Sequence, residues 1–407
     1  MRFTYRCADC GTRYDTDEIM YRCPACDFPT SGDFQRGNLI VDLNHEDLKE
    51  LSTREHITPQ DFFPYEIPTP EAYPVGNTPL ATSPRLSKTY GIKNLRFKLD
   101  GQNPSGSFKD RASQLIAAQA LSKGENKVVL ASTGNAGSAM ACAGAAYGLE
   151  IVLFVPASAP VNKLMQSVLY GAHVIPVNGT YDDAFALSIA YSQEYGGINR
   201  NTAYNPMTIE GKKSISIELF EQMGRKLPDV VYVPVGDGVI ISGVYKGFYD
   251  LMAAGITDKV PALVCVQSSG SDAISRAWES GDYKVLEKAT TTADSISVSS
   301  PANGRMAVEY IKSSKGWSTI INDDDISEAQ LELARDSGLF AEPAAAAAWA
   351  GVIADKETII ERFGEEAEVL VLLTGTGFKD MKSFDGKVSI PPSIEPDIDA
   401  MRTYMNK

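Results

Sequence analysis

The sequence predicts an α/β protein in which buried parallel strands alternate with helices, preceded by a small zinc-ribbon-like segment. Short, unbroken apolar runs recur between residues 95 and 373, as is typical of strands buried on both faces of a parallel sheet. Stretches of helical length separate these runs, which favours right-handed crossovers between neighbouring strands. Two Cys-x-x-Cys pairs near the N-terminus predict the additional small segment.

The chain is long and acidic. Its 407 residues are 43% hydrophobic, and at roughly 150 residues per domain this length suggests two or three domains. Thirty-eight Lys and Arg against 52 Asp and Glu give a formal net charge of −14, which disfavours nucleic acid as a partner because such binding depends on clustered cations. The one uncharged run long enough to cross a bilayer, residues 128–149, contains four glycines and reads as strand, loop and helix. Because the first residues also lack the apolar core of a signal peptide, we expect a cytoplasmic protein without a membrane partner.

Four of the six cysteines lie in the first 26 residues, as Cys7-Ala-Asp-Cys10 and Cys23-Pro-Ala-Cys26, with twelve residues between the pairs. Two such pairs supply the four thiolates of a structural Zn²⁺ site, which leaves no open coordination position for catalysis. Two disulfides or four free thiols are the alternatives, and a reducing cytoplasm disfavours disulfides. The pattern predicts a zinc ribbon over residues 1–36, with two short hairpins leading into the two pairs.

The remaining chain divides into a connector, a large body and a tail. Residues 37–75 mix helical turns with a Pro- and aromatic-rich stretch and are expected to connect the ribbon to a body at residues 76–385. Strands are expected at 95–97, 128–131, 151–155, 174–177, 230–235, 263–266 and 369–373, and helices at 107–122, 138–147, 161–170 and 181–195. Ligands should bind at the carboxyl ends of these strands. Residues 386–407, with three prolines, form the expected tail.

The most informative segment for chemistry runs Asn103-Pro-Ser-Gly-Ser-Phe-Lys109-Asp-Arg111, a polar turn that leads into a helix. Ser107 is expected to cap the turn that carries Lys109. A lysine at a helix N-terminus opposes the helix dipole, which makes sense if its amine is neutral or condensed with an aldehyde. The alternative is that Lys109 is an ordinary exposed lysine on a helix, which is what an isolated lysine with no supporting motif would suggest.

Three loops that follow expected strands supply that context. The first, which opens a helix and whose N–H groups could hold a carboxylate, contains Ser132, Thr133, Gly134, Asn135 and Ala136. The second, which has the arrangement of a phosphate cradle, contains Gly236, Asp237, Gly238, Val239 and Ile240. The third presents the hydroxyl of Thr374. Together with a candidate Schiff-base lysine, these loops match what pyridoxal 5'-phosphate requires.

At this level the sequence resembles the threonine synthase family and its fold-type II, pyridoxal-phosphate-dependent relatives. The resemblance extends from the cysteines to about residue 379, and the cysteine pairs are similar to those of archaeal-like members. It rests on the segments Gly76-Asn-Thr-Pro-Leu80, Gly106-Ser-Phe-Lys-Asp-Arg111, Ser132-Thr-Gly-Asn135, Glu342-Pro-Ala344 and Leu373-Thr-Gly375. It implies two open twisted sheets flanked by helices, with a smaller lobe at roughly 126–205, a small amino-acid substrate and a homodimer.

The resemblance also implies a role for each candidate residue. Lys109 would form the Schiff base with the cofactor and later move protons, Phe108 would pack beside the cofactor ring, and Asn135 would hydrogen-bond the ring hydroxyl. Thr374 would face the pyridine nitrogen. The loop at 132–136 would bind the substrate's α-carboxylate, and the loop at 236–240 would hold the cofactor's phosphate. In threonine synthase this chemistry eliminates phosphate from O-phosphohomoserine and adds water to give threonine.

Three segments depart from the family pattern. The family's phosphate loop usually reads Gly-Asn-x-Gly-Asn, whereas Asp237 places an anion in this chain, and Gly375-Thr-Gly-Phe-Lys379 replaces Gly-His-Gly-Leu-Lys. Where the family often has an Asn-Ser pair and an arginine that grips the substrate phosphate, this chain has Thr202, Ala203 and Thr208. The cations that could compensate, or could instead be solvated surface groups, are Lys212, Lys213, Arg305 and Lys379.

Three functions therefore stay open at the level of sequence. The first is the threonine synthase reaction, and the preferred class is elimination or replacement at Cβ or Cγ of a small amino acid. The second is an ammonia-lyase acting on serine, threonine or diaminopropionate, or a replacement enzyme of the cysteate-synthase type. The third, a catalytically inactive zinc-ribbon binding protein, predicts no Schiff base and leaves Lys109 and its loops unexplained.

Overall fold

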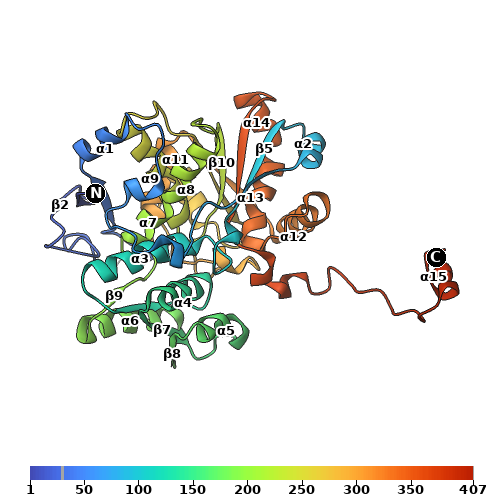
Figure 1. The fold of residues 1–407 in the computed structure, drawn as a ribbon, viewed down its shortest axis with the longest axis horizontal. Coiled ribbons are helices and arrows are strands. Elements are labelled where there is room, and N and C mark those ends of the chain that lie inside the picture. The colour runs from blue at the N-terminus through green and yellow to red at the C-terminus, as the bar shows by residue number, and fades with distance from the viewer. Residues whose placement is uncertain (29–31, 407) are drawn as a thin grey trace.

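The computed structural model describes residues 1–28 and 32–406, and three sheets organise this part of the chain (Figure 1). The largest has six strands in the order β12-β11-β10-β13-β5-β4, all parallel except the edge strand β4, which is antiparallel to β5. Their bounds are β12 (Trp317–Ile321), β11 (Ala262–Ser268), β10 (Val230–Pro234), β13 (Glu368–Leu373), β5 (Asn94–Leu99) and β4 (Leu80–Thr82).

The second sheet is fully parallel, with four strands in the order β8-β7-β6-β9. It spans residues 127–199 through β6 (Lys127–Ala131), β7 (Glu150–Pro156), β8 (His173–Val177) and β9 (Ile198–Asn199). All seven apolar runs that predicted strands lie within strands of these two sheets, apart from one residue at the end of β10. The chain is thus of the predicted α/β class.

Alternate residues of the large sheet pack into two separate cores. In β10, Val231 and Val233 belong to one buried cluster, whereas Val230 and Tyr232 belong to the other. Because successive side chains of a strand point to opposite faces, both faces of this sheet are buried. This explains why its strands β10, β11 and β13 appear in the sequence as continuous apolar runs rather than as alternating patterns.

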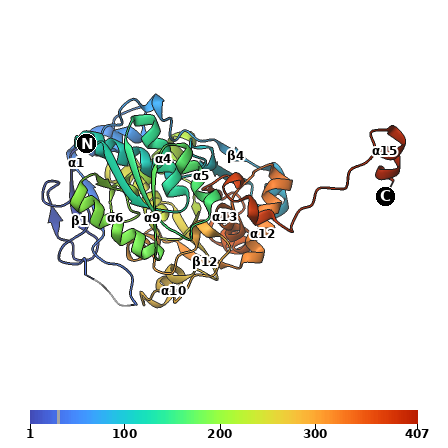
Figure 2. The ribbon, with the colours of Figure 1, turned by 90° about the horizontal axis from the view of Figure 1, so that it is seen from below.

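Helices cover the faces of both sheets (Figures 1 and 2). Those that surround or adjoin the large sheet are α2 (Pro84–Tyr90), α8 (Ser214–Gln222), α9 (Val239–Ala253), α10 (Ala273–Ser280), α11 (Gly304–Ser313), α12 (Asp323–Glu332), α13 (Pro343–Ala354) and α14 (Lys356–Phe363). Those nearest the smaller sheet are α3 (Lys109–Ser122), α4 (Asn135–Tyr147), α5 (Val161–Leu169) and α6 (Tyr181–Tyr195), and α7 (Met207–Lys212) packs against α3 and α9. The expected helices all form, although α4 begins three residues earlier than predicted and α3 begins two residues later.

The N-terminal segment forms a three-stranded antiparallel sheet in the order β2-β1-β3. Its strands are β1 (Phe3–Cys7), β2 (Arg13–Tyr14) and β3 (Leu39–Leu43), and α1 (His45–Leu51) follows. The hairpin predicted at the first cysteine pair is present as β1 and β2. At the second pair the described backbone pairing is a single bridge between Arg22 and Asn38, so the second hairpin is shorter than expected.

The C-terminal tail leaves the body after residue 385 and ends in α15 (Ile398–Met405), well away from the two sheets (Figures 1 and 2). Its apolar side chains are exposed, with Ile390 at 96% and Met405 at 69% of their maximum accessible area. Across residues 1–28 and 32–406, no helix is both long and apolar enough to cross a membrane.

Candidate active site

Lys109 is fixed at the start of α3 by contacts between the preceding turn and the loop that follows β13. The Phe108 N–H donates to the Thr374 carbonyl over 2.8 Å, and Ser107 forms an isolated bridge with Gly375. The hydroxyl oxygen of Ser107 accepts the Lys109 N–H over 3.3 Å, but the N-cap position of α3 is Phe108, one residue later than expected from the sequence. Lys109 and Thr374 are therefore brought together at the carboxyl end of the large sheet.

A cavity of about 770 Å³ opens at this point between the two sheets. It collects most of the residues proposed from the sequence, namely Lys109, Ser132, Thr133, Gly134, Asn135, Ala136, Gly236, Asp237, Gly238, Val239, Ile240 and Thr374. Phe108 is not among the lining residues, because its ring is fully buried in the core behind α3, with the Arg111 guanidinium 5.7 Å from its centre. Cavities of this size at the carboxyl ends of strands are typical ligand sites of α/β proteins.

The amine of Lys109 has a lowered pKa. Burial is the largest cause, and the positive charge of Arg200 lowers the pKa further, while the carboxyl groups of Glu342 and Asp237 oppose both effects. A lowered pKa increases the neutral fraction of the amine, and only the neutral amine can condense with an aldehyde or accept a proton. The electrostatics thus agree with the argument that the sequence makes from the helix dipole.

The loop after β6 turns its backbone into the cavity at the start of α4. The Ser132 hydroxyl oxygen accepts the N–H groups of Gly134 and Gly137 over 3.3 and 3.1 Å, which holds the turn in shape. The first N–H groups of a helix have no partner within it, so Asn135 and Ala136 present donors to an anion. The Asn135 amide donates to the Glu342 carboxylate over 3.1 Å.

The loop after β10 presents the N-terminus of the 15-residue helix α9 to the same cavity. Gly238 has φ of +85°, and a Cβ there would lie 2.7 Å from the Ala307 methyl group, so only glycine fits this turn. A phosphate group fits this cradle of N–H groups and a helix N-terminus. Asp237 is held through its Oδ1, which accepts the Ala302 N–H over 3.2 Å, and burial raises its pKa, which favours the neutral carboxylic acid.

Glu342 is a site residue that the sequence marks only through its family motif. Its carboxyl group is buried, it accepts from Asn135, and its charge acts on Lys109. A Cβ at Gly375 would lie 2.4 Å from its Oε1, which explains why a glycine follows Thr374. Burial raises the Glu342 pKa. The sequence signal for this site residue is a glutamate directly before a long apolar helical run, in the segment Glu342-Pro-Ala344.

The four candidate compensating cations have different positions. Lys212 lines the cavity and Lys213 lies in a buried ion-pair network, so the alternative of solvated surface cations is wrong for both. Lys379 donates to Gln166 over 2.5 Å and to Ser138 over 3.1 Å beside a neighbouring pocket. Arg305 lies over the Tyr283 ring at 4.3 Å, away from the cavity. Arg200, which the sequence analysis did not select, is nearly fully buried and contacts Thr202.

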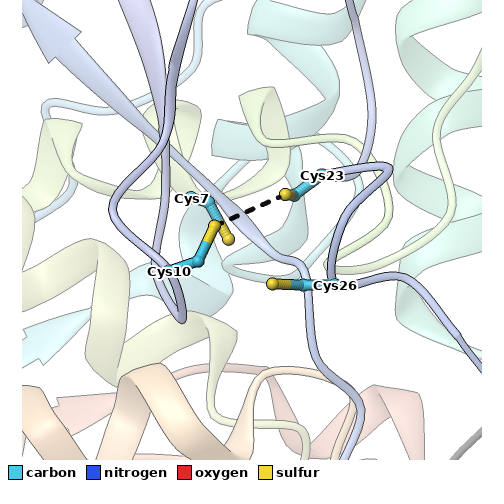
Figure 3. Close-up of side chains that lie close together, drawn as sticks. All are labelled: Cys7, Cys10, Cys23 and Cys26. Carbon is cyan, nitrogen blue, oxygen red and sulfur yellow. Dashed lines mark hydrogen bonds between the residues drawn. The ribbon is translucent and has the colours of Figure 1, made fainter.

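The four N-terminal cysteines converge, as Figure 3 shows. Their sulfur atoms, from Cys7, Cys10, Cys23 and Cys26, all lie within 4.8 Å of one another, and none is in a disulfide. A tetrahedral zinc with Zn–S bonds of about 2.3 Å places its sulfur ligands about 3.8 Å apart. The Sγ atoms of Cys10 and Cys23 are 3.7 Å apart, so the donor set fits such an ion.

Residues 72–375 match the protein-family model described as "Pyridoxal-phosphate dependent enzyme". The match includes Lys109 and all three loops of the cavity. This defines the class of protein: an enzyme whose cofactor is pyridoxal phosphate.

Two curated threonine synthases are similar to the chain along nearly its whole length. The protein of Methanosarcina acetivorans is 34% identical over 403 residues, covering 98% of this chain and 97% of its own. That of Methanocaldococcus jannaschii is 32% identical over 415 residues, covering 99% of both chains. The chain therefore belongs to the threonine synthase family of pyridoxal-phosphate-dependent enzymes.

The fold is also that of solved enzymes of this class. The processed form of threonine deaminase isoform 2 from Solanum lycopersicum superposes with a TM-score of 0.65 over 76% of this chain and 87% of its own, at 22% sequence identity. This likeness supports the fold-type II architecture, with two sheets that share one cavity.

Proposed function

We propose that the cavity holds pyridoxal phosphate with its aldehyde at Lys109, its phosphate at the loop 236–240, its ring hydroxyl at Asn135 and its pyridine nitrogen at Thr374. The loop 132–136 would bind the α-carboxylate of the substrate, and Phe108 would support the start of α3 from the core. When bound, the cofactor supplies an electron sink for a carbanion. The residues at 76–385 act as the catalytic body in this proposal.

We infer that the reaction converts O-phosphohomoserine and water to threonine and phosphate. The observation that carries this proposal is the similarity to threonine synthases over 98% and 99% of the chain. The lowered pKa of the Lys109 amine supports its role in this reaction, because a neutral amine can take a proton from the substrate and return it.

The test is a panel of amino-acid substrates scored for released phosphate and for released ammonia. We expect phosphate and threonine from O-phosphohomoserine with the wild type, and loss of both with Lys109→Ala, together with loss of the visible absorption band of the bound cofactor. Ammonia release from serine, threonine or diaminopropionate, without phosphate release from O-phosphohomoserine, would support the lyase alternative. A protein that binds no cofactor would support the inactive binding-protein alternative.

We also propose that Cys7, Cys10, Cys23 and Cys26 bind a structural Zn²⁺. Four converging sulfur atoms at tetrahedral spacing support this, as does the absence of disulfides among the described cysteines. Free thiolates of this kind fit a reducing compartment, which favours the cytoplasm. Metal analysis of the purified protein should give one zinc per chain, and Cys7→Ser with Cys10→Ser should remove it. A metal-free protein of full stability would contradict the proposal.

We propose that the chain forms a homodimer. Several apolar side chains of α5 are exposed, including Val161 at 72% and Leu169 at 78%, and Phe378 beside them is exposed at 75%. Exposed apolar side chains that lie together are typical of protein–protein interfaces. Light scattering should give twice the mass of the chain, and Leu169→Lys should shift the particle towards the monomer. A monomeric wild type would exclude the proposal.

A further inference from the structure

Arg200 follows β9, the strand beside β6 in the smaller sheet. Its N–H donates to the Val129 carbonyl of β6 over 2.8 Å, so Arg200 lies at the same carboxyl edge as the loop that begins at Ser132. The Arg200 Nη1 donates over 3.1 Å to the hydroxyl oxygen of Thr202, a residue that lines the active-site cavity. Arg200 itself is not among the lining residues, so this contact places its guanidinium behind Thr202 in the cavity wall.

Two of the guanidinium nitrogens of Arg200, Nε and Nη2, are buried and have no hydrogen-bond partner within the described chain. These two atoms form one edge of the guanidinium plane, the edge that binds two oxygens of a carboxylate or phosphate side by side. Leaving such donors unpaired in a protein interior costs free energy, more so when the group is charged. The arrangement therefore calls for an oxyanion at this edge.

Lys212 lines the cavity and likewise has no carboxylate partner among the described residues. Its side chain is 1% exposed, and its amine donates to the Thr208 carbonyl over 2.8 Å. The buried ion pairs of the described chain join Lys98, Arg111, Lys213 and Lys246 to carboxylates, and neither Arg200 nor Lys212 takes part in them. The pKa of Lys212 is well below its usual value because of burial and the charges of Arg200 and Lys109.

The carboxyl group of Asp237, whose charge acts on Lys212, forms no ion pair with Lys212 or Arg200 within the described chain. The Asp237 Oδ1 instead accepts the Ala302 N–H over 3.2 Å. The cofactor phosphate that we propose at the loop 236–240 already has the N–H groups of that loop and the start of α9. The groups around Arg200 and Lys212 can therefore hold a second anion.

We propose that Arg200, Lys212 and the hydroxyl of Thr202 form the binding site for the phosphate group of the substrate. This inference rests on the proposed function and names the residues that replace the family's arginine, whose place Thr208 occupies. The bidentate edge of Arg200 matches two phosphate oxygens, and Lys212 adds a point charge. The site selects phosphorylated amino acids, because a neutral hydroxyl in their place would leave both buried cations unpaired.

Inorganic phosphate is the probe for a test that does not depend on turnover. Phosphate in the millimolar range should raise the Tm of the wild-type holoenzyme by about 2 °C or more, because it binds the folded state only. The Arg200→Met holoenzyme should show no such rise, and Arg200→Lys should show a smaller one, since lysine lacks the planar fork. Arg305→Met is the matched control, because Arg305 lies over the Tyr283 ring away from the cavity, and its holoenzyme should keep the response to phosphate. An equal rise in wild type and Arg200→Met would overturn the proposal.

Kinetics and cofactor titration then separate the substrate's phosphate from the cofactor's phosphate. In Arg200→Met the KM for O-phosphohomoserine should rise roughly 10- to 150-fold, the loss expected for hydrogen bonds to a charged group. The affinity for pyridoxal phosphate, followed by the visible band, should change less than about threefold. Loss of cofactor affinity with an unchanged KM would show that Arg200 holds the cofactor instead, which also overturns the proposal.

Failure of the proposed function gives a different pattern of results. If the wild type does not turn over O-phosphohomoserine, but phosphate still stabilises it and not Arg200→Met, the reaction is wrong and the phosphate site stands. If the wild type does turn over O-phosphohomoserine, while Arg200→Met changes neither KM nor the response to phosphate, the site is wrong and the reaction stands.

Discussion

Lys212 and Lys213 are neighbours in sequence and equally buried, yet their surroundings differ completely. The Lys213 amine is paired with Glu210 and, over 2.8 Å, with Asp250, and Lys246 completes the network through Asp250. Lys212 has a single backbone carbonyl and lies among positive charges. A buried cation with carboxylate partners belongs to the scaffold, whereas one without them on a cavity wall indicates a place for an anionic ligand.

A second scaffold network shows why part of the family motif is structural rather than catalytic. Arg111 is paired with Asp100 and, over 2.9 Å, with Glu218, and Lys98 also reaches Glu218. The Thr78 hydroxyl donates to Asp100 over 2.7 Å. The motif residues around Lys109 and in Gly76-Asn-Thr-Pro-Leu80 thus hold the start of α3 against the large sheet.

The largest effect predicted from this comparison is the loss of stability in Lys213→Met. The substitution leaves Glu210 and Asp250 buried with Lys246 as their remaining cation, and breaking a buried ion pair typically costs about 3–5 kcal/mol. We expect a fall of that size in the free energy of unfolding, measured by urea denaturation at pH 7.

Lys212→Met is the matched comparison, since it removes a buried amine with no carboxylate partner. Its free energy of unfolding without phosphate should stay within about 1 kcal/mol of the wild type or rise. Equal destabilisation by the two substitutions would show that pairing with a carboxylate does not determine how much a buried lysine contributes to the free energy of unfolding.

The sequence predicted those parts of the fold whose physics is local. Most of the apolar runs from residue 128 to residue 373 become strands with both faces buried, as in β6, β7, β10, β11 and β13, so nearly every position carries the signal. The edge strand β8 is predicted by its run although it is partly exposed. Strands β4 and β9 are too short for a pattern, and β12 mixes Trp317 with Ser318 and Thr319, so these three were missed. The glycine-rich loops could be recognised in the sequence because few residue types other than glycine allow a tight turn directly after a buried strand.

The cationic part of the site could not be predicted in the same way. Arg200 lies between two asparagines with no periodic pattern around it, and the groups on which its charge acts come from three other segments, at Lys109, Tyr181 and Lys212. Only the fold shows that no carboxylate among the described residues approaches it. Tyr21 and Arg22 of the ribbon were likewise assigned to a separate unit, although Arg22 lines the cavity.

The pH dependence of stability provides a further prediction, with a smaller expected effect than that of Lys213→Met. Burial raises the pKa of Asp110 from 3.8 to about 6, and the hydrogen bonds from Tyr73 and Ser105 and the charge of Lys379 oppose this rise only in part. Between pH 4 and pH 6 the unfolded chain therefore ionises this carboxyl first, and stability falls as the pH rises, by about 2–3 kcal/mol. Asp110→Asn should lack this fall when urea denaturation is compared at pH 4 and pH 7.

Glu218 should behave in the opposite sense, because the cations Arg111 and Lys98 lower its pKa to about 2. Its contribution is complete above pH 4.5 and is lost as the pH falls towards 2. The cost of Glu218→Gln should therefore be largest at pH 7 and shrink on acidification. If Asp110→Asn and Glu218→Gln changed stability in the same direction with pH, the distinction between unpaired and paired buried charges would fail for acids as well.

The smallest predicted effect concerns Arg22 of the ribbon, whose guanidinium has one nitrogen paired with a carboxylate and another that is buried and unpaired among the described residues. Its Nη1 pairs with Asp27 over 3.1 Å and its guanidinium lies 5.4 Å from the centre of the Tyr204 ring, while its buried Nε has no hydrogen-bond partner among residues 1–28 and 32–406. Tyr21 next to it accepts the Asn199 N–H over 2.9 Å, which joins the ribbon to the strand that precedes Arg200. Because Arg22 is partly paired, Arg22→Ala should raise the KM for O-phosphohomoserine by about fivefold and leave kcat and cofactor binding unchanged.

Arg13→Ala is the matched control on the same ribbon, since Arg13 is exposed and pairs with Asp42 outside the cavity, and it should leave the KM unchanged. An equal KM for both variants would mean that the ribbon does not contribute to substrate binding and that the charge of Arg22 is neutralised by Asp27.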